Sequence, residues 1–161
     1  LASLIVLILR LLRPPARPRP QSTTPAPAPS RAYVVVDGSN VMHWKDNTPS
    51  LETLREVVAA LQKLGYTPGI VFDANAGYKL EGRYRHDGAL ARALHLPEDR
   101  IMVVPKGTQA DELILAAARD LDARIVSNDG FRDRAEAHPE VLQPGHVIRG
   151  GYRDGKLWLA G

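Results

Sequence analysis

Four aspartates stand where their side chains could gather into one site. Asp37 opens an Asp-Gly-Ser-Asn turn after an apolar run, Asp111 falls in the first turn of an expected helix, and Asp129 and Asp133 follow another apolar run. Carboxylate oxygens are hard ligands that suit Mg²⁺ or Mn²⁺ and not zinc. Such an ion supports phosphate ester hydrolysis, because it polarises a phosphate oxygen and lowers the pKa of a bound water.

Each of these motifs alone also has a purely structural interpretation. The Asp37 turn could be an ordinary strand-to-loop turn in which Ser39 and Asn40 bond to the backbone. Asp111 could simply favour the dipole of the helix that it begins. Asp133 could pair with an adjacent arginine. The motifs gain weight only if the fold brings them together.

Apolar runs and amphipathic stripes alternate along the chain from residue 32 onward. Short β-branched runs predict buried parallel strands, and stripes bounded by capping residues predict helices. Their alternation predicts an α/β fold, a three-layer α/β/α Rossmann-like sandwich with a mostly parallel central sheet. Strands are expected at 32–37, 69–73, 101–104, 123–127, 145–148 and 156–159, and helices at 51–64, 88–96, 109–121 and 131–137.

The expected sheet places the acids on one rim. Carboxyl ends of parallel strands meet at the edge where ligands of such folds bind. Asp37, Asp73 and the Asn128-Asp129 pair all follow expected strands. Several carboxylates at one edge repel one another and raise one another's pKa values. Because a divalent cation would remove that repulsion, the combination favours a metal site.

Three segments carry a family resemblance. The stretches VVVDGSNVMH, KGTQADELILAAA and IVSNDGFRD resemble the NYN-domain ribonucleases of the PIN-like superfamily, in the branch typified by the immune-regulatory CCCH zinc-finger RNases. The resemblance covers residues 32–159, which is essentially the whole expected domain. The chain has no cysteine, so it lacks the zinc finger and the target selection that the finger provides.

The resemblance implies Mg²⁺- or Mn²⁺-dependent endonucleolytic cleavage of single-stranded or stem-loop RNA. By residue match, it makes Asp37, Asp111, Asp129 and Asp133 the metal-binding acids. We expect them to hold one ion, directly or through water; a second ion on RNA binding is the alternative, and the sequence leaves the number of ions open. It makes Asn40 the residue that orients the substrate or a metal-bound water. The auxiliary candidates at the site are Ser39, Asp73, Glu112 and Asn128.

Basic residues near the expected site could contact RNA. Lys79, Arg83 and Arg85 form a basic stretch interleaved with tyrosines between the second strand and the next helix, and Lys106 precedes the Asp111 helix. Basic loops with aromatic side chains suit RNA phosphates and bases. A solvated loop is the alternative interpretation. Trp44 either stacks on a base or packs in the core.

Other function classes fit the sequence poorly. The first strand is not followed by G-x-G-x-x-G, which argues against a dinucleotide cofactor, and no GK[ST] motif of a P-loop NTPase is present. A haloacid dehalogenase phosphatase needs a second Asp two residues after the first, where this chain has Ser39. The main alternative is a membrane-tethered RNA-binding or scaffold module with little or no catalysis.

The N-terminal region differs in composition from the rest. Residues 1–12 contain an apolar run of nine residues, about 13.5 Å of helix, against about 30 Å for a bilayer core. We interpret them as part of a single-pass membrane anchor; a secretory signal remnant and a mistranslated upstream stretch are the alternatives. Residues 13–31 read as a disordered Pro/Arg-rich linker, and residues 32–161 as the ribonuclease domain. Arginines after the apolar run predict a cytoplasmic domain tethered to the inner membrane face.

Net charge separates the two regions. Five arginines and no acid precede residue 32, so 16 of the 21 basic residues and all 18 acidic residues follow it, giving the domain a charge of about −2. The basic pI of 9.4 therefore arises from the N-terminal region. The sequence leaves the oligomeric state open, with a homodimer among the alternatives.

Overall fold

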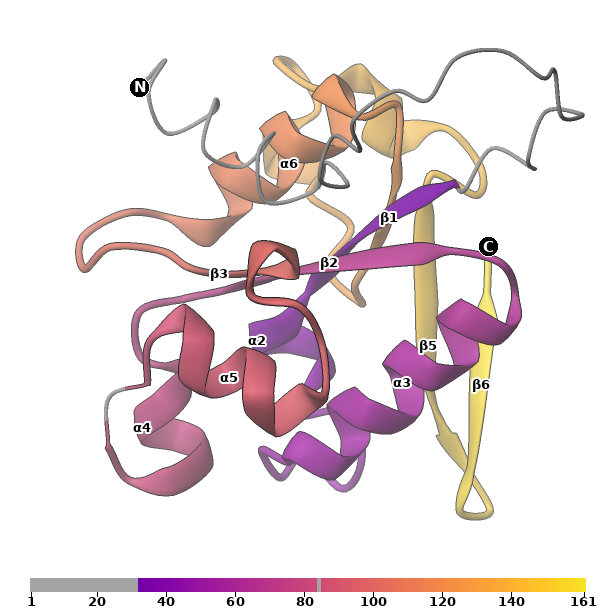
Figure 1. Cartoon of the computed structure of the whole chain (residues 1–161). Coiled ribbons are helices and arrows are strands. Elements are labelled where there is room, and N and C mark those ends of the chain that lie inside the picture. The colour runs from indigo at the N-terminus through magenta and orange to yellow at the C-terminus, as the bar shows by residue number, and fades with distance from the viewer. Residues whose placement is uncertain (1–31, 84) are drawn as a thin grey trace, which may run out of the picture.

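The computed structural model describes residues 32–83 and 85–161. They form a six-stranded sheet in the order β3-β2-β1-β4-β5-β6 (Figure 1). Neighbouring strands from β3 to β5 run parallel, and β6 pairs antiparallel with β5. The strands are β1 (Tyr33–Asp37), β2 (Thr67–Phe72), β3 (Ile101–Val103), β4 (Arg124–Val126), β5 (Val147–Arg153) and β6 (Lys156–Ala160).

Helices connect the parallel strands. The α-helices are α2 (Gly38–Val41), α3 (Leu51–Lys63), α4 (Ala76–Glu81), α5 (Asp87–Leu94) and α6 (Ala110–Asp120). Single 3-10 turns are η1 (Glu98–Arg100), η2 (Arg132–Arg134) and η3 (Pro139–Leu142). Ser50 caps α3 as its sequence predicts, because its side chain accepts a hydrogen bond from the Thr53 amide.

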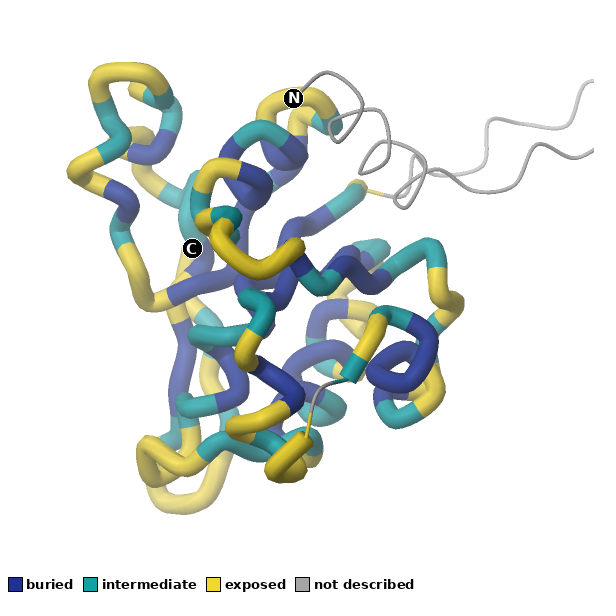
Figure 2. The backbone as a smooth tube through the Cα atoms, turned by 90° about the vertical axis from the view of Figure 1, so that its left-hand side faces the viewer, coloured by how far each residue is buried: buried dark blue, intermediate teal, exposed yellow. Residues whose placement is uncertain are grey.

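Two apolar cores, one on each face of the sheet, make the three layers. Val34 and Val36 of β1 face the core that contains α2, α3 and α5, while Val35 faces the core that contains α6. This alternation follows from the two-residue period of a strand. Buried segments accordingly concentrate in the strands and the inner sides of the helices (Figure 2). The predicted three-layer α/β fold with a mostly parallel sheet is confirmed.

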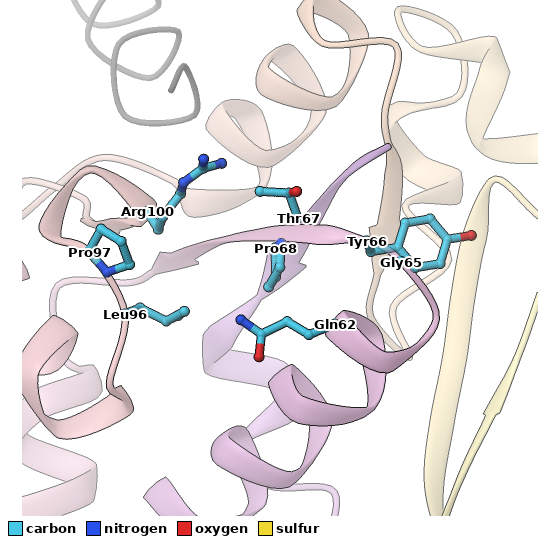
Figure 3. Close-up of a pocket in the computed structure, with 8 residues that line it drawn as sticks. All are labelled: Gln62, Gly65, Tyr66, Thr67, Pro68, Leu96, Pro97 and Arg100. Carbon is cyan, nitrogen blue, oxygen red and sulfur yellow. The ribbon is translucent and has the colours of Figure 1, made fainter. Parts of the chain in front are cut away.

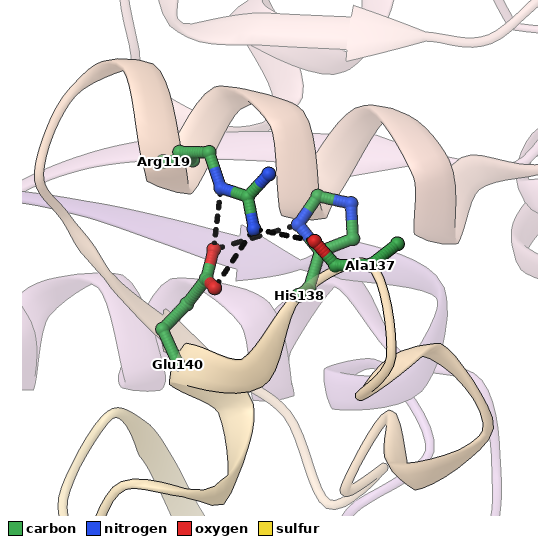
Figure 4. Close-up of polar contacts among 4 residues, drawn as sticks. All are labelled: Arg119, Ala137, His138 and Glu140. Carbon is green, nitrogen blue, oxygen red and sulfur yellow. Dashed lines mark hydrogen bonds and ion pairs between the residues drawn. The ribbon is translucent and has the colours of Figure 1, made fainter.

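An ion pair fastens η3 to the outside of α6. The Arg119 guanidinium donates from Nε to Glu140 Oε1 at 2.8 Å and from Nη2 to Oε2 at 2.9 Å, and Nη2 also donates to the Ala137 carbonyl (Figure 4). Hydrogen bonding from Arg119 is the main cause that lowers the pKa of Glu140 to about 2. The segment between β4 and β5 is thereby held against the helix that carries Asp111.

The structure differs from the sequence prediction in four places. Helix α4 occupies part of the stretch expected to be a basic loop, and the expected helix at 131–137 is only the 3-10 turn η2. Strand β5 runs to Arg153 instead of ending at 148, because it continues past β4 as the partner of β6. Helix α6 begins at Ala110, and its N-terminal capping residue is Gln109.

Among residues 32–83 and 85–161, no helix is long and apolar enough to span a membrane. The expected anchor at 1–12 and the expected linker at 13–31 lie outside the described residues.

Candidate active site

Asp37 is the buried acid at the centre of the site. It ends β1 with only 7% of its surface exposed. Its Oδ1 accepts a hydrogen bond from the Asn40 amide at 3.2 Å, and its Oδ2 accepts one from the Ser127 hydroxyl at 2.8 Å. Burial is the largest influence and raises the pKa of Asp37 to about 6, although both hydrogen bonds oppose the shift. The nearby charges of Asp111 and Asp129 raise it further.

Asp111 and Asp129 reach the same rim from two other elements. Asp111 lies in the first turn of α6, and Asp129 follows β4. Burial and then the charge of Asp129 raise the pKa of Asp111. The Asp129 carboxylate closes a local turn, since its Oδ1 accepts from the Phe131 amide at 2.8 Å. The charges of Asp111 and Asp129 thus act on Asp37, and the charge of Asp129 acts on Asp111.

Asp133 and Glu112 lie at the edge of this group. Asp133 contributes to the raised pKa of Asp111, but its side chain is 75% exposed and pairs with Arg134 Nε at 3.3 Å. Glu112 pairs with the same arginine at 3.5 Å. Arg134 thus neutralises part of the outer negative charge. Asp111 and Asp129 both raise the pKa of Asp37, whereas Asp133 raises the pKa of Asp111.

Asn40 joins the turn after β1 to the loop after β4. Its Oδ1 accepts from Trp44 Nε1 at 2.8 Å and from the Asn128 amide at 2.9 Å. Asn128 in turn pairs through its side chain with both backbone groups of Gly150. Trp44 packs against Gly150, where an added Cβ would lie 2.2 Å from the indole, so Trp44 serves the core. Asn40 therefore fixes the loop that carries Asp129.

Ser127 is a site residue that the sequence analysis missed. Its side chain is completely buried, its hydroxyl donates to Asp37 Oδ2, and it accepts from the Asp129 amide at 3.1 Å. One hydroxyl thus sets the position of two acids. A buried serine between a strand and an Asn-Asp pair was the only available sequence signal, and such a residue usually just turns the chain.

The turn after β1 packs against β2 and against the loop that follows β2. The Asp73 amide donates to Ser39 Oγ at 2.8 Å, and Asp73 Oδ1 accepts from the Asn75 amide. Gly38 permits close approach, because an added Cβ would lie 2.5 Å from Phe72 Cε1. Ser39 is therefore a structural partner of Asp73, and Asp73 stays on the rim as predicted.

A cavity of about 380 Å³ opens between these elements. It is lined by Asp37, Ser39, Asn40, Asp73, Thr108, Gln109, Ala110 and Asp111. A larger pocket of about 530 Å³ lies at the opposite end of β2, where Tyr66, Pro68, Leu96 and Arg100 contribute to its lining (Figure 3). No carboxylate lines that pocket, so the acidic cavity is the candidate active site.

The oxygen donors of the site suit a hard cation better than the present spacing of its carboxylates does. Its donors are carboxylate and amide oxygens, and a nearly buried carboxylate with a raised pKa gains from a nearby positive charge. Within the described part of the chain, however, no three Asp, Glu or His side chains converge closely enough to form a ready metal cluster. The carboxylates of Asp37 and Asp129 are instead held by hydrogen bonds.

The predicted basic RNA contacts are mostly paired with acids. Lys79 lies on α4 with its Nζ 3.8 Å from Asp73 Oδ2. Arg83 and Arg85 both pair with Glu81, and Arg85 also donates a hydrogen bond to it. Lys106 is exposed in the loop before α6. The stretch from 79 to 85 thus carries less unpaired positive charge than its sequence indicates.

A Rossmann-like sheet with acids at its carboxyl edge is the arrangement of PIN-like nucleases. The family model described as the Zc3h12a-like ribonuclease NYN domain matches residues 30–144, well over half of the chain. The chain belongs to this family of ribonuclease domains. A comparison with curated proteins found no significant match.

Solved structures support the same fold. Two structures of the nuclear protein-only RNase P 2 of Arabidopsis thaliana match with TM-scores of 0.59 and 0.62, at 22% and 23% sequence identity. The matches cover 80% and 82% of this chain but only 29% and 30% of the RNase P chains. At such identity the likeness shows the fold alone.

Proposed function

We propose that this chain is a divalent-metal-dependent endoribonuclease whose active site is the acidic cavity at the end of β1. The observation that carries the proposal is the buried Asp37 carboxylate with Asp111 and Asp129 beside it. A negative cluster disfavours RNA, which is itself an anion, unless a cation lies between them. Membership of a ribonuclease family supplies the choice of RNA as substrate.

Asp37, Asp111 and Asp129 would hold the ion, Mg²⁺ or Mn²⁺, and Asp133 would support it from the edge of the site. When bound, the ion would neutralise the carboxylates, polarise a phosphate oxygen and lower the pKa of a water molecule. Other residues of the chain hold the acidic cavity in shape. Ser127 orients Asp37 and the Asp129 backbone together, and Asn40 anchors the Asp129 loop.

The reaction is hydrolysis of an RNA phosphodiester. Water attacks phosphorus opposite the 3′-oxygen, the bond to that oxygen breaks, and a proton from the water ends on the leaving group. The products are a 3′-hydroxyl and a 5′-phosphate. The open cavity beside Asp37 and Asp111 gives the backbone of a single strand room to enter.

A second candidate is an RNA-binding module of the same fold with little or no catalysis. The spacing of the acids favours it, because no ready metal cluster exists among the described residues. The two candidates differ in what happens to bound RNA.

Cleavage of labelled RNA separates them. The full chain is incubated with single-stranded and stem-loop RNA in Mg²⁺, Mn²⁺ or EDTA, beside the variants D37N and D129N. Asp120, exposed at the far end of α6, gives the matched control D120N. We expect cleavage with either ion, loss in EDTA and in both site variants, and retention in D120N. Cleavage that persists in EDTA contradicts the metal mechanism, and binding without cleavage favours the second candidate.

A further inference from the structure

One face of the β5–β6 hairpin is basic and aromatic. Strand pairing places Gly151 opposite Trp158 and Arg153 opposite Lys156. Directly opposed residues share a face, and residues two apart along a strand do too. We call this set of residues the hairpin face: Arg149, Gly151, Arg153, Lys156 and Trp158.

The other face of the hairpin is committed to the core. Gly150 packs against Trp44 and Leu159, and the Tyr152 hydroxyl donates to Glu56 Oε2 at 2.6 Å. The charged residues of the hairpin face are all exposed, and Trp158 is 38% exposed. The indole lies across Gly151, where an added Cβ would be 3.3 Å from it, and the Arg153 guanidinium lies 5.9 Å from the ring centroid. An exposed aromatic ring is thus held in place beside positive charge.

The hairpin face begins at the acidic site. The Arg149 Nη1 donates to the carbonyl of Asn128, the residue before Asp129, at 3.2 Å. From there β5 runs beyond the end of β4, so the face continues outward from the rim (Figure 1). Val147, two residues before Arg149, packs in the α6 core. The hairpin face therefore lies on the same side of the sheet as α6 and Asp111.

Arg132 extends the positive surface toward the acids. Arg132 and Arg149 both line a pocket of about 410 Å³, and Val141 and Pro144 also contribute to its lining. A Cβ at Gly130 would lie 3.1 Å from Arg149 Nη2 and 3.6 Å from Arg132 Cγ. The glycine after Asp129 thus lets both arginines close over the backbone at the site.

The charge of this surface contrasts with that of the domain. Residues 32–161 carry about −2, yet residues 147–160 contain three basic residues and a single acid, Asp154, in the turn. Arg83 and Arg85 of the earlier basic stretch share Glu81 as a partner. Within residues 32–83 and 85–161, by contrast, Arg149 and Arg153 form no ion pair with an acid. From Arg149 to Arg153 the strand covers about 13 Å, a span of a few nucleotides.

We propose that the hairpin face, with Arg132, is the surface that binds single-stranded RNA leading away from the acidic site. This inference rests on the proposed function and assigns the place of the RNA chain beyond the cleaved bond. The arginines and Lys156 contact phosphates, and a base stacks on Trp158, which is the combination that sequence-tolerant single-strand binding uses. A duplex would not offer an unstacked base to the indole.

Binding measured without a divalent ion tests the inference apart from cleavage. Fluorescence anisotropy of a labelled single-stranded RNA is followed in EDTA over a range of salt concentrations, using the full chain. The variants are W158A, W158F and R153Q/K156Q. The control is K63Q/R92Q, which removes the same charge from exposed positions on α3 and α5.

The variants have distinct expected effects. W158A should weaken binding about 5- to 100-fold with little change in salt dependence, and W158F should recover most of that loss. R153Q/K156Q should reduce the slope of log affinity against log salt by about 1.4, or about 0.7 per phosphate contact. K63Q/R92Q should bind like the wild type, and a duplex should bind less tightly than the single strand.

The outcomes separate this inference from the proposed function. Equal binding by wild type, W158A and R153Q/K156Q overturns the inference, even if the chain cleaves RNA. Weaker binding by the hairpin variants supports it, even if no cleavage occurs in Mg²⁺ or Mn²⁺. A wild type that binds no RNA also overturns it. R153Q/K156Q changes only exposed side chains, so its result holds if W158A loses stability.

Discussion

Replacing Asp37 with asparagine should stabilise the metal-free protein while abolishing cleavage. Asp37 is nearly buried beside two other acids, and its pKa lies at about 6 against 3.8 for the ordinary side chain. Because the folded state binds the proton of Asp37 more tightly than the unfolded state does, protonated Asp37 contributes fully to wild-type stability below about pH 4. This contribution is lost as the pH rises through 6.

The size of the effect follows from the pKa difference. A difference of about two units corresponds to about 3 kcal/mol of folding free energy at pH 7.5. Asparagine keeps the shape and stays neutral, but its amide must donate to Ser127 where Asp37 Oδ2 accepted, a change of about 1 kcal/mol. We expect a net gain of about 1–2 kcal/mol, or a rise in Tm of about 4–8 °C for a domain of this size.

Thermal unfolding of D37N and wild type in EDTA, from pH 4 to pH 8, measures this difference. Taking the difference between the two proteins cancels the titration of groups that they share. The gap in Tm should be largest above pH 7 and should close toward pH 4. Added Mg²⁺ should stabilise the wild type and not D37N, and D120N should follow the wild type throughout.

Two results would contradict this expectation for D37N. If D37N unfolds at a lower temperature than the wild type at pH 7.5, then the ionised carboxylate of Asp37 does not destabilise the folded state. If the gap in Tm does not change with pH, then the pKa of Asp37 is not raised by burial among other acids.

Three further substitutions test the supports of the site. S127A removes the buried hydroxyl that bonds to Asp37 and Asp129. We expect a loss of about 1–3 kcal/mol in unfolding free energy at pH 7.5 and slower cleavage. An unchanged Tm and an unchanged cleavage rate would mean that Ser127 positions neither acid. N40A leaves Trp44 Nε1 and the Asn128 amide without their acceptor. We expect a similar loss of unfolding free energy in chemical denaturation, with faster amide hydrogen exchange around residue 128. Amide exchange at the wild-type rate would show that Asn40 does not anchor the Asp129 loop. G38A places a Cβ against Phe72; we expect destabilisation of about 1–3 kcal/mol, and a stability equal to that of the wild type would show that the β1 turn can move away from β2.

The fold follows from sequence because its signals are periodic. The β-branched runs of β1 and β2 and the apolar stripe of α6 each indicate one element, and their alternation indicates the layers. Helix α4 was not predicted because Ala76–Glu81 is short and contains a glycine and a tyrosine. It forms through the tertiary packing of Ala76 and Gly77, which are buried. The long β5 escaped because its second half contains two adjacent glycines, which sequence patterns assign to turns.

The acids of the site were predictable, but their neighbours were not. Strand ends identify Asp37 and Asp129, and the resemblance identifies Asp111. The partners of Asn40 are the Trp44 side chain and the Asn128 backbone, 88 residues away for the latter, and no local pattern records such a contact. A count of basic residues alone overstates the free positive charge of this stretch, because Lys79 pairs with Asp73 and Arg85 pairs with Glu81, four positions before it.

We expect Asp37, Asp111 and Asp129 together to bind one divalent cation. Titration of the full chain with Mn²⁺, followed by the electron paramagnetic resonance signal of the free ion, tests this claim without depending on RNA. We predict one saturable site in the wild type and in D120N, with marked loss of affinity in D37N, D111N and D129N. Equal Mn²⁺ binding by the wild type and all three site variants would show that these carboxylates do not bind the ion.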